Sequence, residues 1–209
     1  MLKSGLNFPA LLVITTLYIT GCGTAVRNTG DKGYNGSFSP EEIMLITSRE
    51  NKTPFRVLQT DNKQDSIFLR GTSSDVDPVA DKSLIEILTE RMYKTVTDSA
   101  SLGVGIAAPQ IGISKNVILV QRLDKPGSPF EVYLNPEIIQ YSKMKQDCRE
   151  GCLSVPDRRG VTKSRSYAIL VKYRRADNSS VTEMVEGFTA VIFQHETDHL
   201  KGALFFDYL

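Results

Sequence analysis

The sequence contains few of the side chains that most often bind transition metals, since its 209 residues include only two histidines and three cysteines. It also lacks an excess of charge: the formal net charge is +1, and the chain after residue 21 has 24 basic and 24 acidic side chains. This balance gives no support for binding to nucleic acid. No internal repeat is visible, and 41% hydrophobic with 23% charged residues is the composition of an ordinary globular domain.

The first 21 residues are largely apolar, with Lys3 near the start, and are too short to span a bilayer comfortably. They predict a signal peptide and export. Because the stretch ends in Gly21-Cys22, it resembles the cleavage site of bacterial lipoproteins, in which a small residue precedes a cysteine that becomes lipidated. We therefore expect a lipid anchor at Cys22 and a location at a membrane of the cell envelope. An ordinary signal peptide is one alternative, and translation from Met44 would give a cytoplasmic form.

Residues 22–52 are expected to be a flexible tether, because their first half is rich in Gly, Asn, Ser and Thr and has no apolar period. One folded domain is predicted over residues 53–209, which is long enough for a single core. Apolar residues at helical spacing predict a helix over residues 83–96, beginning with a capping-box pattern from Ser83 to Glu86.

Antiparallel strands are predicted where β-branched residues run or alternate between turns, at residues 116–122, 130–134 and 167–174. A last helix is predicted from Phe188 to Gly202, where glycine suits a left-handed cap. The predicted fold class is α+β, with antiparallel strands packed around this last helix.

The last predicted helix carries both histidines, four residues apart, in the HExxH pentad from His195 to His199. This spacing places two imidazoles on one helix face, where neutral rings can bind a transition metal. Glu196 lies beside them and can move protons to and from metal-bound water. Two surface histidines would be the simpler interpretation, but an apolar stripe flanks them and indicates a buried face.

A tetrahedral metal with one position open for water needs a third protein ligand, from a cysteine or a carboxylate. Cys152 lies in the compact segment EGCLSVP and is a candidate. Three motifs, in their order along the chain, resemble those of the peptide deformylase family. They are GVGIAAPQ at residues 103–110, EGCLS at residues 150–154 and QHETDHLKG at residues 194–202. The resemblance covers about residues 53–209.

The resemblance implies an enzyme that removes the N-formyl group from N-formylmethionyl peptides, with Fe²⁺ as cofactor and zinc, nickel or cobalt as substitutes. It implies three metal ligands, Cys152, His195 and His199. Metal-bound water is the expected nucleophile, and Glu196 is expected to take its proton and pass it to the leaving amine. By the same resemblance, the Gln110 amide and the backbone N–H of Leu153 donate to the formyl oxygen as its charge develops. Glu150 and Gln194 are expected to orient the ligands.

The glycine-rich loop can offer its backbone to an extended peptide, with Gly105 as the expected pairing position. The substrate methionine is expected against an apolar wall, and an arginine is expected to contact the substrate. The residues are Ile106, Phe188, Val191 and Ile192 for the wall, and Arg159 for the contact. Cys148 is expected to face the same side as Cys152 without bonding to it, because in a strand their Cα atoms would be about 13 Å apart.

Two rival functions are consistent with parts of the sequence. A zinc endopeptidase of the extended motif would need a third histidine six residues after His199, but that position is Phe205 and no other histidine exists. A tethered lipoprotein that only binds metal or formyl peptide would need neither Glu196 nor Gln110. Export also separates the protein from nascent chains, so other formyl peptides are an alternative substrate.

Overall fold

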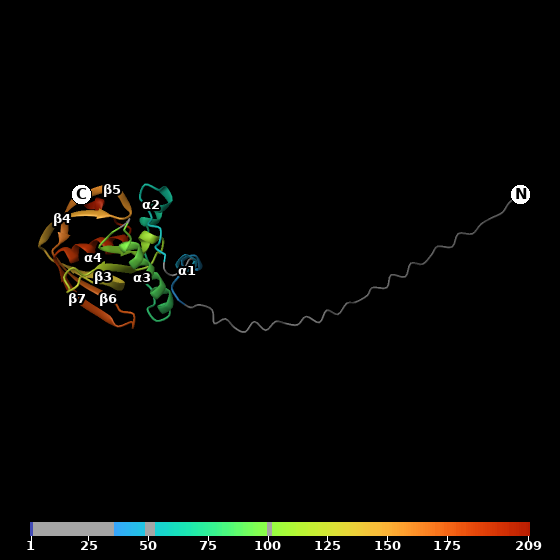
Figure 1. Ribbon diagram of the computed structural model, residues 1–209, viewed down its shortest axis with the longest axis horizontal. Coiled ribbons are helices and arrows are strands. Elements are labelled where there is room, and N and C mark those ends of the chain that lie inside the picture. Colours follow the sequence, from blue (N-terminus) through green and yellow to red (C-terminus); the bar gives the residue numbers. More distant parts are fainter. Residues whose placement is uncertain (2–35, 49–52, 100–101) are drawn as a thin grey trace. The chain divides into compact units, whose positions relative to one another are not determined.

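The structure is a computed structural model that describes residue 1 and residues 36–48, 53–99 and 102–209 (Figure 1). Residues 2–21 of the predicted signal peptide, the lipidation site Cys22, and residues 22–35 and 49–52 of the predicted tether lie outside the described residues. Among the helices of the described part, none combines the length and the apolar character that crossing a membrane would require.

Five antiparallel strands form the main sheet, in the order β1-β2-β3-β6-β7. Their bounds are β1 Gly105–Ala107, β2 Val117–Gln121, β3 Phe130–Tyr141, β6 Ala168–Arg174 and β7 Ser180–Glu186. A separate two-stranded ribbon consists of β4 Lys145–Cys152 and β5 Val155–Ser166. The helices are α1 Pro40–Thr47, α2 Lys63–Leu69, α3 Lys82–Thr97 and α4 Gly187–His199, with short 3₁₀ turns η1 Ala108–Ile111 and η2 Phe205–Tyr208.

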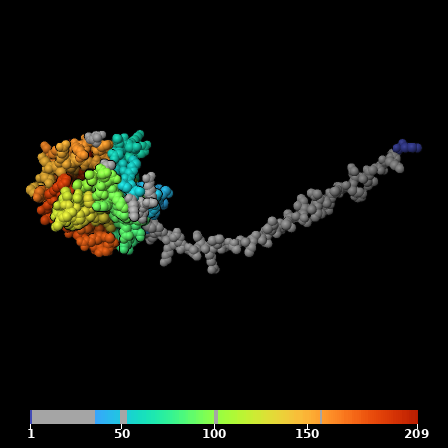
Figure 2. All heavy atoms as spheres, in the orientation of Figure 1, coloured from blue at the N-terminus to red at the C-terminus, as the bar shows by residue number. Residues whose placement is uncertain are grey.

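The main sheet has a core on each face, because successive side chains of a strand point to opposite sides. In β2, Val117 and Leu119 pack into the cluster that contains α3, while Ile118 and Val120 pack into the cluster that contains α4. Figure 1 shows α4 between the β4–β5 ribbon and strands β3, β6 and β7. On the face that Figure 2 shows, the red atoms of the C-terminal region appear only in small areas, and most residues of α4 are buried.

The predicted α+β class is confirmed, and so are its main elements. The helix predicted over residues 83–96 is α3, and the last helix is α4, followed by Gly202 in a left-handed conformation at φ +71°. The strands predicted at residues 116–122, 130–134 and 167–174 correspond to β2, β3 and β6. Strand β3 continues seven residues further than the apolar pattern, to Tyr141, because its second half pairs with β6.

Two local predictions are wrong. Part of the expected tether is helix α1, which begins with a capping box at Ser39 and buries Ile46 against the core. The capping box predicted at Ser83 does not form, because α3 begins earlier, with Asp81 as N-cap. The sequence patterns also did not predict α2 or the strands β4, β5 and β7, which contain mostly polar residues.

Candidate metal centre and substrate pocket

Helix α4 brings both histidines to one place. It begins at Gly187, whose φ of +62° turns the chain from β7, and its buried face packs against strands of the main sheet. Gly202 closes the helix so tightly that a Cβ there would clash with the Arg70 carbonyl, which explains why only glycine fits. The Gln194 amide is fixed by hydrogen bonds to the backbone of Ser166, so it anchors α4 to the end of β5.

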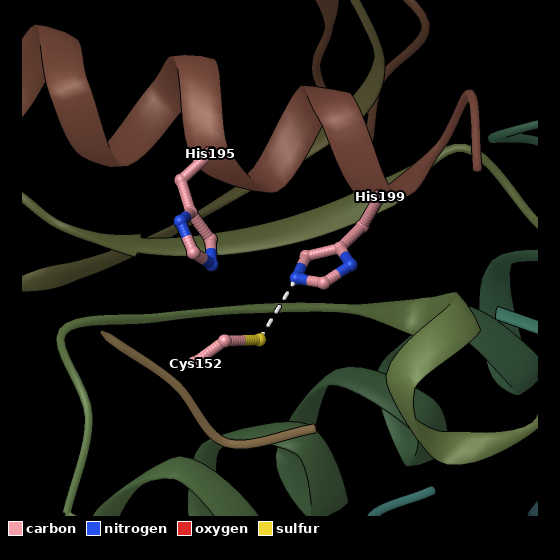
Figure 3. Close-up of side chains that lie close together, drawn as sticks. All are labelled: Cys152, His195 and His199. Carbon is pink, nitrogen blue, oxygen red and sulfur yellow. Dashed lines mark hydrogen bonds between the residues drawn. The ribbon is translucent and has the colours of Figure 1, made fainter. Parts of the chain in front are cut away.

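Cys152 approaches the histidines from the end of β4, directly before the turn to β5. Its Sγ lies 3.3 Å from Nε2 of His199 (Figure 3). The ligand atoms of Cys152, His195 and His199 all lie within 4.8 Å of one another. A tetrahedral ion bonded to a sulfur at roughly 2.3 Å and a nitrogen at roughly 2.0 Å would hold these two atoms roughly 3.5 Å apart. The three side chains therefore fit one metal ion.

Buried hydrogen bonds orient the His195 ring. Its Nδ1 lies 2.7 Å from Oε2 of Glu150, which leaves Nε2 for an ion. Glu150 also accepts from Arg165 at 2.8 and 3.0 Å and from the Thr162 hydroxyl. Burial alone would raise the pKa of Glu150, but the bonds from His195 and Arg165 lower it to about 2. Glu150 is thus a fixed negative charge behind the ring, as the sequence predicted.

Glu196 differs from Glu150 because one of its oxygens is unsatisfied. Its side chain is buried against Gly105, where an added Cβ would lie 2.5 Å from Oε1. Oε2 has no hydrogen-bond partner among the described residues, and neither has Nδ1 of His199. Burial raises the pKa of Glu196 to about 7 and lowers that of His199 well below its usual value. A neutral His199 can bind a metal, and Glu196 can exchange a proton near neutral pH.

The Gln110 side chain has a defined orientation at the same place. Its Oε1 accepts from the backbone N–H of Ala107 at 2.8 Å, which directs Nε2 towards Cys152 Sγ at 3.4 Å and Ser154 Oγ at 3.3 Å. The adjacent Leu153 peptide is held through its carbonyl, which accepts from Gln59 Nε2 at 2.9 Å. Gln110 and Leu153 thus both border the space in front of the three ligands.

A pocket of about 370 Å³ opens in front of these groups. The predicted substrate residues Gly105, Arg159, Phe188, Val191 and Ile192 all line it, as do Cys152, His195 and Glu196. Ile106 does not, so its predicted place on the pocket wall is wrong. Its neighbour Gly105 faces Glu196 and α4, whereas Ile106 is fully buried in the cluster with α3 on the opposite face of β1.

Cys148 and Cys152 are both free cysteines, and Cys148 is buried. It lies outside the pocket lining, because the register of β4 against β5 shifts between Gly151 and Cys152 and turns Cys152 away from the strand's regular alternation. Sequence reasoning missed Arg165, Thr162 and Gln59. Their roles depend on which distant segments of the chain meet, and no local motif indicates them.

The HExxH helix and a cysteine of the β-ribbon bring three ligand atoms together beside a buried carboxylate. This site, in an α+β fold, defines the class of metal-dependent hydrolases. The chain belongs to the polypeptide deformylase family, whose sequence pattern matches residues 55–209. Members of this family depend on a metal.

The comparisons include peptide deformylase 1 of Clostridium perfringens, which is 39% identical over 69% of this chain and 92% of its own length. A peptide deformylase of Desulforudis audaxviator is 44% identical over 59% of this chain and 76% of its own length. Among solved structures, the Met-Ala-Ser-bound class I type b peptide deformylase of Acinetobacter baumannii matches with a TM-score of 0.65 and 35% identity, covering 76% of this chain and 99% of that one. The Thermotoga maritima enzyme matches with a TM-score of 0.64 and 33% identity, covering 75% and 97% of the two chains.

Proposed function

We propose that the protein hydrolyses the N-formyl group of N-formylmethionyl peptides. The observation that carries this proposal is the unpaired, buried Oε2 of Glu196 beside the ligand cluster of Cys152, His195 and His199. A buried carboxylate oxygen without a protein partner costs free energy, and the proposed reaction supplies a partner for it. That partner is the proton of a water molecule.

A bound ion supplies Lewis acidity, which acidifies water and polarises the formyl carbonyl. Glu196 accepts the proton from water as the oxygen attacks the formyl carbon, and then gives it to the nitrogen that leaves as the peptide amine. Gln110 donates its amide N–H to the formyl oxygen, where negative charge develops. Its orientation is set in advance by the bond from Ala107, so no reorganisation is needed when the charge appears.

The pocket suits a peptide that begins with methionine. Phe188, Val191 and Ile192 give an apolar wall next to the cluster, and β1 is an edge strand whose free side can pair with an extended peptide. A bound Met-Ala-Ser in the Acinetobacter baumannii relative supports the same substrate type. Gly105 keeps the approach open, since any side chain there would press on Glu196.

We infer that Fe²⁺ is the ion bound in the cell. The mixed sulfur and imidazole ligands suit several divalent metals, so zinc, nickel and cobalt are expected to substitute. Metal analysis of protein purified without exposure to air would test this assignment. Zinc in place of iron in such a preparation would contradict it.

Two variants of the mature chain test the activity. Glu196→Ala should keep the metal and lose roughly 10²- to 10⁴-fold in kcat on formyl-Met-Ala-Ser, whereas Cys152→Ala should lose the metal as well. Equal turnover by Glu196→Ala and the unaltered protein would overturn the proposal. Cleavage of internal peptide bonds without release of formate would favour the endopeptidase instead.

We also propose that the protein is a lipoprotein of the cell envelope, anchored at Cys22. The apolar stretch before Gly21-Cys22 supports this location. A start at Met44 is disfavoured, because it would remove the buried Phe38 and the Ser39 cap of α1. A mass spectrum of the native N-terminus should show a diacylated or triacylated residue 22, and an unmodified chain that begins at Met44 would refute the anchor.

A further inference from the structure

The mouth of the pocket is basic. Three arginines of the β4–β5 ribbon line the pocket and are exposed to solvent: Arg149, Arg158 and Arg159. We refer to them as the rim arginines. The acidic residues that line the same pocket are Glu150 and Glu196, and both are buried. A ligand that reaches the rim therefore meets positive charge.

Two acids near the rim, Glu150 and Asp207, are paired with other arginines. Glu150 bonds to Arg165, and Asp207 bonds to Arg70 at 2.5 and 3.0 Å. Among the side chains that the structure describes, no ion pair joins a rim arginine to a carboxylate. The rim arginines can therefore pair with a carboxylate that comes from outside the protein.

Two of the rim arginines are held in place by their surroundings. Arg159 lies opposite Gly151 in the ribbon and crosses it so closely that a Cβ on Gly151 would be 2.6 Å from its guanidinium nitrogen. The guanidinium of Arg158 lies 4.4 Å from the centre of the Phe206 ring. Guanidinium groups that are already positioned lose less conformational entropy when they bind a ligand.

We propose that the rim arginines select formyl peptides that carry a carboxylate within a few residues of the methionine. This inference rests on the proposed function, which places the formyl group at the cluster and the methionine side chain on the apolar wall. The next residues then leave the pocket across the rim. An acidic side chain and the free C-terminus of a short peptide offer the same carboxylate chemistry.

Because the rim arginines are exposed, an ion pair between one of them and a substrate carboxylate contributes little alone. From the three arginines together we expect roughly a five- to tenfold preference for the peptide that carries the carboxylate. The carboxylate lies away from the bond that breaks, so the preference should appear in KM rather than in kcat. It should shrink as salt rises from about 0.02 to about 0.5 M, since the Debye length then falls below the size of the rim.

Two matched peptide pairs test the inference with the full mature, metal-loaded protein. Formyl-Met-Ala-Ser with a free C-terminus is compared with its amide, and formyl-Met-Ala-Glu amide with formyl-Met-Ala-Gln amide. A lower KM for the carboxylate member of either pair supports the inference, and the pair that shows it identifies the source of the carboxylate. Equal kcat/KM within both pairs at low salt would overturn it, while the proposed function would stand. Failure to hydrolyse any of the four peptides would overturn the proposed function itself.

The double variant Arg149→Gln, Arg158→Gln should reduce the preference within each pair to about twofold or less. The ratio is measured on one protein sample, so the fraction of active enzyme cancels. Arg175→Gln is the matched control, because this exposed arginine lies in the turn after β6 and does not line the pocket. The control should keep the full preference. An undiminished preference in the double variant would show that Arg149 and Arg158 do not cause it, and would overturn the proposal that the three arginines act together.

Discussion

The region around α4 and the region around α1 and α3 both bury charged side chains, but they treat them differently. Near α1 and α3, the buried Arg91 donates to the carbonyls of Leu45, Ile46 and Thr53 and stacks on Phe55 at 3.7 Å. Around α4, two buried polar atoms have no partner among the described residues, on Glu196 and His199. In the described ranges, the remaining buried side-chain atom of this kind is Ser73 Oγ. Charge is thus used for stability in one region and kept available for chemistry in the other.

Outside Glu196 and the metal ligands, the largest effect is expected at Gln110, in the region around α4. Gln110→Met keeps the side-chain volume but removes the N–H donor, so kcat should fall by roughly 10²- to 10³-fold with a smaller change in KM. Steady-state kinetics on formyl-Met-Ala-Ser would measure it. Ser154→Ala is the control, because it removes a hydroxyl next to the amide but leaves the amide itself. Equal losses in both variants would show that the donor is not the active feature.

In the region around α1 and α3, a substitution should reduce stability and leave kcat unchanged. Arg91→Met leaves three carbonyls without their donor, so the free energy of unfolding should fall by about 3 kcal/mol. Denaturant titration would measure this, and kcat per folded molecule should stay unchanged. Lys94→Met, on the same helix but in a solvent-exposed pair with Glu90, should cost less than about 0.5 kcal/mol. A large loss of kcat in folded Arg91→Met would contradict the separation of the two regions.

Glu150 lies beside the metal ligands, but its carboxylate is fully paired. It therefore tests whether a paired buried charge also contributes to the function of the site. Glu150→Gln removes the negative charge behind His195 and should weaken metal affinity by roughly 10- to 100-fold. Competition with a chelator would measure the affinity. Asp198→Asn alters the other carboxylate that pairs with Arg165 and leaves Glu150 in place, so it should have a smaller effect. Unchanged affinity in Glu150→Gln would mean that the ring is oriented by α4 alone.

The smallest expected effect concerns pH and stability at Asp65. The bond from Arg56, together with the Gln59 backbone N–H, lowers the pKa of Asp65 from 3.8 to about 2. Because the folded-state pKa is the lower one, the stabilisation is present above about pH 4 and is lost as pH falls towards 2. Asp65→Asn should lower stability by about 1 kcal/mol or less at pH 7, and the difference from the unaltered protein should vanish near pH 2. A constant difference in thermal melts between pH 7 and pH 2 would refute this assignment.

Much of the site could be predicted because part of it is local. Two histidines four residues apart share a helix face whatever the rest of the fold does, and the apolar stripe beside them indicated that the face is buried. Helix α3 and strands β2, β3 and β6 followed from hydrophobic period in the same way. The roles of Cys152, Gln110 and Leu153 came from motif resemblance instead, since no local rule connects them to the helix.

The tertiary structure decided which side chains meet. The β4–β5 ribbon consists largely of polar residues, so its hydrophobic pattern does not predict strands, yet it carries Cys152 to a histidine 47 positions away and places Arg165 behind Glu150. It also decided that Gly105 faces the site while Ile106 faces α3. The local sequence sets the periodicity of apolar residues along a strand. Which face of that strand meets a given helix depends on pairing with distant residues. Glu196 Oε2 is buried without a protein partner only once those segments are packed together.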